Sequence, residues 1–434
     1  MLCKTFAREY RRCRFDWQPS GIHRFRSSGA PCLLRLKCGR GYLAEDLSSH
    51  GCKTRAVSND PINRDQRLPR RQSFACFNSV CRTTDGASGK NQRIEGSTLD
   101  RPNTSLKDRF LGCLLGLAIG DAFGMPVEGW TQEEIRQAYG WLDHYVARRG
   151  PDQAVISQPG EITGDTEMAL CLVEGLISAG GFVDPEAIGV RFIKLFNGPS
   201  ECFLGPTTRT AIERMEQTGD YQDGARGDWP SGVGAAARIA PLGLLHAVGH
   251  FNSEVFTREI IRAGLITHCD PESLNGALAM AYALRLVAND EIPPEMLIPE
   301  VAAFIDEDSV ARSLRLAGRL APHGGDPAAD LAHLRQIGTS SYVAEAVAAA
   351  LYCFVCHPND FSGAVQTAVN AGGDTDTIAS MAGSLSGAHL GARRLPPELV
   401  DGLEARMYIL VAAPGLYRMA QRRAGMFLML LERE

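Results

Sequence analysis

The sequence predicts an all-α protein, with one large helical domain at residues 105–434 behind a leader at residues 1–104. Apolar residues recur at helical spacing in segment after segment of the body, and convincing alternation of apolar and polar residues, typical of strands, is absent. With 434 residues, 44% of them apolar and 22% charged, the chain has the composition of a soluble globular protein. We therefore expect a bundle of ten or more helices.

The leader differs from the body in charge and pattern. Residues 1–105 carry 20 Lys and Arg against 9 Asp and Glu, whereas the rest of the chain carries 25 against 41. Seven of the 13 cysteines also fall in the leader, and no apolar periodicity is sustained there. This composition is typical of a disordered segment, and an organelle transit peptide or translated upstream sequence without a role are the alternatives.

Charge and cysteine usage disfavour several classes of function. The acidic body disfavours nucleic acid as the main partner, because phosphate contacts need a basic face. No run of about 18 apolar residues stands out, so neither a membrane span nor a membrane partner is expected. The cysteine spacings match no zinc site, and the odd total does not suggest a disulfide framework. Cys171, Cys353 and Cys356 stand among apolar residues, which favours reduced core thiols in a cytoplasmic protein.

The first helix of the body is expected at residues 106–121. Phe110, Leu114 and Ala118 are spaced four apart, as on the buried face of a helix. The next stretch, GDAFGMPVEG, is rich in helix breakers and carries Glu128, which alone would be interpreted as a surface loop acid.

Two later helices are expected to begin with oxygen-bearing side chains. One follows Gly160 and starts with Thr163 and Asp165 in the string Thr-x-Asp-Thr. The other follows a Gly-Gly turn and starts with the string Asp-Thr-Asp-Thr, which contains Asp374, Asp376 and Thr377. Any one of these acids would be explained as a helix N-cap, because N-terminal N–H groups and the helix dipole favour a carboxylate there.

The three carboxylate-bearing segments share a missing counter-charge. No Lys or Arg occurs between residues 109 and 136, between 149 and 191, or between 335 and 393. Buried carboxylates in these segments would need a basic residue from a distant segment or a bound cation. Carboxylate and hydroxyl oxygens are hard ligands that suit Mg²⁺ or Mn²⁺ and do not suit zinc. Together the two strings favour an oxygen-rich metal site.

Further candidate binding residues lie between these segments. The turn at Gly232 and Gly234 opens into a small-residue stretch, where backbone N–H groups would cradle a phosphate. His268 ends an apolar run and by itself would be a satisfied buried histidine. Tyr342 by itself would be a core aromatic at a helix start.

Taken in order, these motifs resemble the ADP-ribosylglycohydrolase family, typified by the dinitrogenase-reductase-activating glycohydrolase. The resemblance covers about residues 106–424 and rests on GCLLGLAIGDAFGMPVEG, GEITGDTEMAL, SGVGAAARIAPLGLL, GLITHCDPES, SYVAEAVAAALYCF and NAGGDTDTIASMAGSLSGAHLG. It implies an orthogonal all-α fold and a cleft that binds two Mg²⁺ ions, or Mn²⁺. The implied activity is hydrolysis of the bond between ADP-ribose and a modified protein side chain, with arginine as the acceptor.

The resemblance also implies a role for each matched residue. The metal ligands would be Thr163, Asp165, Asp374, Asp376 and Thr377. The catalytic residues would be Glu128, Asp165 and Asp376. The residues that contact ADP-ribose would be Gly232, Gly234, His268 and Tyr342. Two cations about 3.5 to 4 Å apart can hold the vicinal hydroxyls of a ribose and activate a water, and Glu128 would deprotonate that water or protonate the leaving group.

Two positions depart from the family pattern. Gly164 stands where the family usually has a metal-ligating Asp, and Val233 stands where the glycine loop usually has Asn. The alternative function is therefore a catalytically weakened or inactive protein that binds ADP-ribose, or that blocks an ADP-ribosyltransferase with its basic leader. A purely structural helical protein, without a bound metal, is the third alternative.

Overall fold

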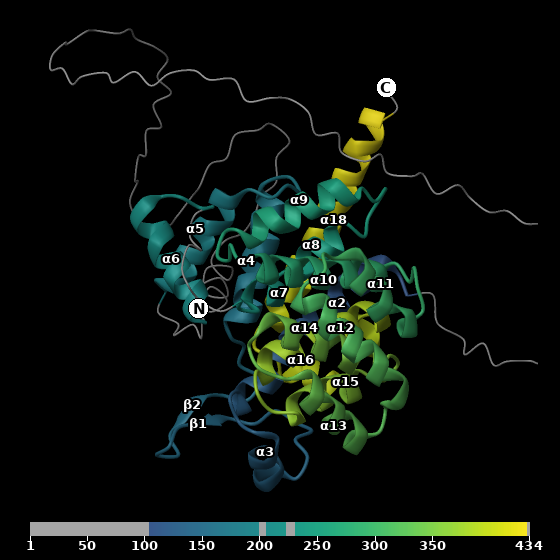
Figure 1. Cartoon of the computed structure of the whole chain (residues 1–434). Coiled ribbons are helices and arrows are strands. Elements are labelled where there is room, and N and C mark those ends of the chain that lie inside the picture. The colour runs from purple at the N-terminus through teal and green to yellow at the C-terminus, as the bar shows by residue number, and fades with distance from the viewer. Residues whose placement is uncertain (1–103, 199–204, 223–230, 432–434) are drawn as a thin grey trace, which may run out of the picture. The chain divides into compact units, whose positions relative to one another are not determined.

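The computed structural model describes residues 104–198, 205–222 and 231–431, with the backbone alone for residues 427–431. All but the last residue of the leader lies outside this range, so its disorder and its boundary with the body stay predictions. Helices make up most of the described chain, which confirms the all-α fold class. Figure 1 shows the helices packed on one another, with only a small pair of strands at one side.

The helices follow one another along the whole described chain. In the first part they are α2 (Leu106–Gly124), η1 (Met125–Val127), α3 (Gln132–Tyr139), α4 (Gly164–Ser178), α5 (Pro185–Phe196), α6 (Pro206–Thr218), α7 (Gly234–Ala237), α8 (Ala240–Leu245), α9 (Ser253–Gly264) and α10 (Pro271–Ala288). In the second part they are η2 (Pro294–Met296), α11 (Leu297–Phe304), α12 (Ser309–Leu320), η3 (Ala321–His323), α13 (Pro327–Ile337), α14 (Val343–Cys356), α15 (Phe361–Asn370), α16 (Thr375–Leu390), η4 (Ala392–Arg394), α17 (Pro397–Gly402) and α18 (Arg406–Leu431).

Helices α2 and α16 cross in backbone contact. One face of α2 carries a glycine every four residues, at Gly112, Gly116, Gly120 and Gly124. A Cβ atom on Gly116 would lie only 2.1 Å from the carbonyl oxygen of Gly383 on α16. Gly112 meets Gly387, whereas Gly124 meets Asp376, so the helices are antiparallel. The C-terminal end of α2 therefore meets the N-terminal end of α16.

Helix α16 is the centre of the hydrophobic core. All its residues are buried, because α2, α10, α14 and α15 pack around it. The other side of α2 packs against α18 and α4. Because α16 is enclosed, the acids at its first turn lie inside the fold.

Helix α2 continues three residues beyond its predicted end and leads directly into η1. Together the two form a stretch, Leu106–Val127, that is long and apolar enough to cross a membrane, with a mean hydropathy of 1.7. No membrane span was expected here from the sequence. In the structure 94% of its most apolar window is buried, and a core helix of a folded protein meets the same criterion.

The described residues contain one short hairpin that the sequence analysis missed. Strands β1 (Arg148–Arg149) and β2 (Val155–Ser157) pair antiparallel, with a register shift between the two arginines. Strands this short carry no alternating pattern, so the periodicity of the sequence did not reveal them. The hairpin lies in the connection between α3 and α4, and β1 packs against η1.

Candidate active site

One cavity of about 410 Å³ brings together every residue singled out as a site residue in the sequence. Its walls come from segments that are far apart in the chain. Those residues are Glu128, Thr163, Asp165, Gly232, Gly234, His268, Tyr342, Asp374, Asp376 and Thr377. Their shared location supports a common site, while the role of each one stays a prediction.

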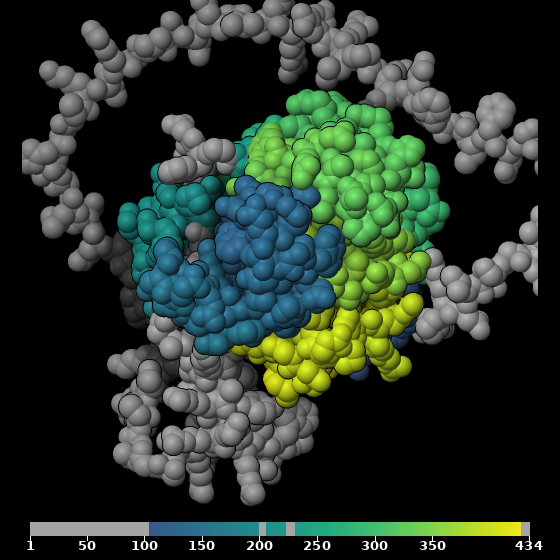
Figure 2. Space-filling view, turned by 90° about the horizontal axis from the view of Figure 1, so that it is seen from below, coloured from purple at the N-terminus to yellow at the C-terminus, as the bar shows by residue number. Residues whose placement is uncertain are grey.

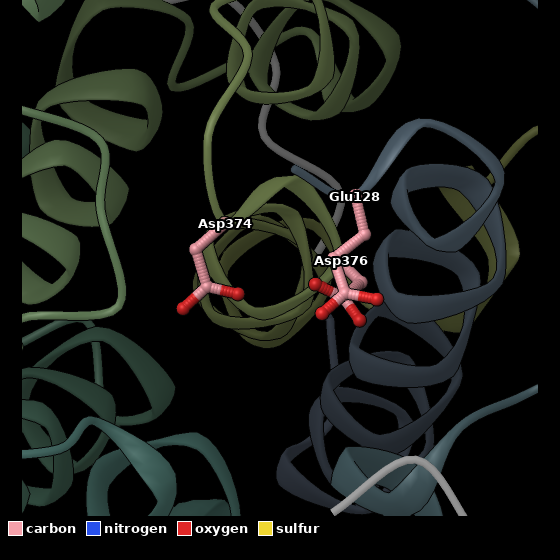
Figure 3. A group of neighbouring side chains, drawn as sticks. All are labelled: Glu128, Asp374 and Asp376. Carbon is pink, nitrogen blue, oxygen red and sulfur yellow. The ribbon is translucent and has the colours of Figure 1, made fainter. Parts of the chain in front are cut away.

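Three of the lining residues form a group of carboxylates, which we call the carboxylate cluster (Glu128, Asp374 and Asp376). Each offers one oxygen atom, and these oxygens all lie within 4.8 Å of one another. Figure 3 shows Asp374 and Asp376 at the start of α16 and Glu128 on the segment that follows α2, with the carboxylates of Glu128 and Asp376 next to each other.

The glycine turn before α16 fixes the positions of these acids. Gly372 and Gly373 have φ angles of 75° and 85°, in the left-handed region that favours glycine. The N–H of Gly373 donates to the carbonyl of Trp130 (2.8 Å), and the N–H of Gly129 donates to the carbonyl of Gly373 (2.8 Å). These two bonds hold the Glu128 segment beside the start of α16.

Asp374 occupies the N-cap position of α16, but its side chain makes no capping hydrogen bond. Its N–H donates to the carbonyl of Thr339 (2.8 Å). The interpretation of Asp374 as a helix N-cap is therefore wrong for its side chain. Its carboxylate lines the cavity instead. Asp376 is 5% exposed and accepts a hydrogen bond from the N–H of Thr377 (2.9 Å).

At the start of α4 the cap is Thr163, not Asp165. The Thr163 hydroxyl accepts a hydrogen bond from the Asp165 N–H (3.3 Å). A second carboxylate, Asp121 of α2, accepts from the N–H groups of Thr163 (3.0 Å) and Thr166 (3.2 Å) and from the Thr166 hydroxyl. The helix start is thus satisfied without Asp165, whose buried Oδ2 atom has no hydrogen-bond partner among the described residues.

The acids of the site destabilise one another in their charged form. Burial, followed by the charges of Asp121 and Asp374, raises the pKa of Asp165 to about 8. Burial raises the pKa of Asp374 to about 6, and burial with the neighbouring acids raises the pKa of Asp376 well above its usual range. Such shifts indicate negative charge that lacks compensation.

Hard-oxygen donors and an unpartnered buried carboxylate oxygen are what a divalent cation requires. The cavity wall offers carboxylates from α4 and α16 and hydroxyls from Thr163 and Thr377. Mg²⁺ and Mn²⁺ bind such oxygens. Among the described residues, no basic side chain forms an ion pair with Asp165, Asp374 or Asp376. The residues present therefore fit one or two divalent cations.

Two arginines from distant segments reach the site, and neither was identified from the sequence. Arg148 of β1 donates to Glu128, with 2.8 Å between Nη1 and Oε2. Arg238 is 2% exposed, lines the cavity and donates to the carbonyl of Gly234 (2.7 Å) and to the hydroxyl of Thr267. Burial lowers the pKa of Arg238 to about 10.

The glycine loop forms another wall of the cavity. Gly232 pairs with Tyr342 in an isolated β-bridge, and the Ser273 hydroxyl donates to the Gly232 carbonyl (2.8 Å). A Cβ atom on Gly234 would lie 3.2 Å from both His268 Cε1 and the Thr208 hydroxyl oxygen, so there is little space for a side chain. The helix after the loop, α7, has only four residues. Any phosphate would therefore meet individual N–H groups instead of a long helix dipole.

His268 and Tyr342 both line the cavity, as the resemblance implied. His268 is 2% exposed, and burial, followed by the charge of Arg238, lowers its pKa to about 3, so its ring is neutral. Its Nδ1 atom lies 2.8 Å from the Thr267 hydroxyl. Tyr342 stands just before α14, and its hydroxyl donates to Glu272 (2.7 Å). A neutral ring and a tyrosine suit contacts with a nucleotide better than proton transfer.

Comparisons with known proteins agree with this geometry. A family model described as ADP-ribosylglycohydrolase matches residues 102–425. The chain is 30% identical to the ADP-ribosylarginine hydrolase Tri1 of Pseudomonas putida (strain GB-1), over 71% of this chain and 78% of that protein. It is 28% identical to the ADP-ribosyl-[dinitrogen reductase] glycohydrolase of Rhodospirillum rubrum, over 70% of this chain and 92% of that protein. A solved structure named ADP-ribosylglycohydrolase-related protein complex is similar with a TM-score of 0.58 and 31% identity, over 73% of this chain and 99% of that one.

Proposed function

The chain belongs to the ADP-ribosylglycohydrolase family, and from that premise we propose that it is a hydrolase that releases ADP-ribose from modified arginine side chains of proteins. The single observation that supports this activity best is the carboxylate cluster in a cavity that the glycine loop also lines. The identity of relatives named as ADP-ribosylarginine hydrolases supports arginine as the acceptor.

We assign metal binding, proton transfer and ADP-ribose binding to different residues of the site. Thr163, Asp165, Asp374, Asp376 and Thr377 would hold two Mg²⁺ or Mn²⁺ ions. Bound there, such ions would orient the ribose hydroxyls and activate a water. The Glu128 side chain is only partly buried, and we assign to it the proton transfer at the scissile bond, to or from its carboxylate. Gly232, Gly234, His268 and Tyr342, which line the same cavity, would bind the rest of ADP-ribose.

The direct test is the release of free ADP-ribose. The purified protein is incubated with ADP-ribosylarginine and Mg²⁺, and the products are separated by chromatography. Release by the natural protein and its loss in Asp374→Ala would support the proposal. Absence of release from both proteins, with either Mg²⁺ or Mn²⁺, would contradict it.

A second candidate is a weakened or inactive protein that binds ADP-ribose or blocks a transferase. Gly164 favours it, because this first residue of α4 stands where relatives with the family pattern have an acid, and a glycine offers no ligand atom. The variant Gly164→Asp distinguishes the two. A large gain in hydrolysis would show that the natural protein is impaired, whereas a measurable natural rate that the variant leaves unchanged or lowers would favour the active enzyme.

The proposed partners follow from the activity. They are ADP-ribosylated proteins and free ADP-ribose as the product, and we propose a cytoplasmic location. Cys113, Cys171, Cys353 and Cys356 are free thiols, which supports that location. Contact with a transferase through the leader concerns residues outside the described range. Loss of transferase binding on deletion of residues 1–100 would test it.

A further inference from the structure

Glu128 differs from the other acids of the carboxylate cluster in how its side chain is held. Its backbone is fixed on both sides, since its N–H donates to the Met125 carbonyl (3.3 Å) and the next N–H, of Gly129, donates to Gly373 (2.8 Å). Its side chain is 38% exposed, whereas Asp376 is buried. Three rotatable side-chain bonds therefore leave the carboxylate several possible positions.

Among the described side chains, Arg148 is the one that hydrogen-bonds to the Glu128 carboxylate. The Nη1 to Oε2 distance is 2.8 Å, and the Arg148 side chain is 24% exposed. The same Nη1 atom lies 3.4 Å from the carbonyl oxygen of Met125. The guanidinium thus bridges the Met125 carbonyl, at the start of η1, and the Glu128 carboxylate, just after η1. This bridge restricts the positions that the Glu128 carboxylate can take.

The hairpin holds Arg148 in place. Arg148 pairs with Ser157 of β2. The Ser157 hydroxyl donates to Glu161 (3.1 Å), and the carbonyl of Gly160 accepts from the N–H of Glu404 (3.0 Å). Figure 2, seen from below, shows the blue segment that includes α3 and the hairpin lying across this face of the fold. The arginine is therefore presented by a fixed strand next to η1.

We propose that Arg148 is a positioning residue that keeps the Glu128 carboxylate in the carboxylate cluster, ready for proton transfer. This inference rests on the function proposed above. An exposed carboxylate that rotates away from the scissile bond is lost to catalysis, and a displacement of about 1 Å can reduce a rate about a hundredfold. Arg148 acts through Glu128 and does not itself contact the reacting atoms.

The test uses three variants of the full chain. Arg148→Met removes the charge and keeps the length, Arg148→Lys keeps a cation without the planar donor geometry, and Arg149→Met is the matched control. Arg149 is the neighbouring residue on β1 and donates to the Gln153 carbonyl (3.0 Å), away from the cluster. The measurements are kcat and KM for ADP-ribosylarginine, the Kd for ADP-ribose, and the melting temperature.

Arg148→Met should lower kcat by about 10- to 100-fold, with KM, the Kd for ADP-ribose and the melting temperature close to the natural values. Arg148→Lys should recover part of kcat, and Arg149→Met should match the natural protein. An unchanged or higher kcat in Arg148→Met would overturn the proposal. A parallel loss of ADP-ribose affinity and melting temperature would also overturn it, because it would show a purely structural role.

A crystal structure of Arg148→Met separates this inference from the proposed function. If the natural protein releases no ADP-ribose, the hydrolase proposal fails, and the position of Glu128 still decides the role of Arg148. Displacement of the Glu128 carboxylate from Asp374 and Asp376, with the natural position kept in Arg149→Met, supports positioning. An unmoved carboxylate in Arg148→Met overturns it.

Discussion

Replacing Gly116 with alanine tests the backbone contact between α2 and α16. The added methyl group would lie 2.1 Å from the carbonyl oxygen of Gly383 and 2.8 Å from its carbonyl carbon. Non-bonded heavy atoms prefer separations of about 3.5 to 4 Å, so the helices would have to move apart by more than about 1 Å. Because the neighbour is backbone, no side-chain rotation can relieve the clash.

The size of the effect follows from two opposing terms. Overpacking of a core costs about 1 to 3 kcal/mol, and a clash with backbone belongs at the upper end. Alanine in place of glycine within a helix returns about 1 kcal/mol. The free energy of unfolding should therefore fall by about 2 kcal/mol, which lowers the melting temperature of a domain of this size by about 3 °C.

Gly425→Ala is the matched control. Gly425 lies within α18, and a Cβ atom there would meet nothing within 4 Å, so the variant should gain up to about 1 kcal/mol of helix propensity without a clash. Both variants would be unfolded in urea and followed by far-ultraviolet circular dichroism. A Gly116→Ala protein as stable as the natural one, or two alanine variants shifted in the same direction, would refute the close crossing.

Two further predictions concern the metal site and a buried network. The melting temperature should be higher with Mg²⁺ than with a chelator, because an ion that binds the folded state stabilises it by mass action. Asp374→Ala should abolish this difference. Equal melting temperatures of the natural protein in the two conditions would favour the purely structural alternative. Burial alone would raise the pKa of Asp330, but hydrogen bonds from His357, Tyr352 and the Gly325 N–H outweigh it and lower that pKa. The folded protein should therefore lose stability as the pH falls below about 4, the pKa of an aspartate in the unfolded chain. At neutral pH, Asp330→Asn should be less stable than the natural protein by about 1.5 to 3 kcal/mol, and in acid the two should become equally stable. A difference in the free energy of unfolding in urea that stays constant with pH would contradict this.

The helices and their starts were predictable because their signals are local. The Gly372 and Gly373 turn marks the start of α16, and the Thr163 hydroxyl marks the start of α4. The meeting of these two starts with Glu128 in one cavity was expected from the shared lack of nearby basic residues and from the family resemblance, and the structure places them there.

The basic residues of the site were not predictable in the same way. Arg148 comes from a polar connection whose strands are too short to show a pattern, and it reaches Glu128 across 20 residues. Arg238 stands in an apolar stretch and donates a hydrogen bond to the Thr267 hydroxyl on another segment. Asp121 looked like the end of a helix, yet its carboxylate accepts hydrogen bonds from the N–H groups of Thr163 and Thr166 at the start of another helix, α4. Each of these contacts is set by tertiary packing, which leaves no periodic trace in the sequence.

The antiparallel crossing of α2 and α16 has a consequence for biosynthesis. The Thr375 hydroxyl donates to the Gly124 carbonyl, a contact between residues 251 positions apart in the chain. Such distant pairings form slowly, and a growing polypeptide cannot make this one before α16 has left the ribosome. A chain truncated before α16 would lack the central partner of α2, so the cavity at the start of α16 could form only after α16 has been synthesised.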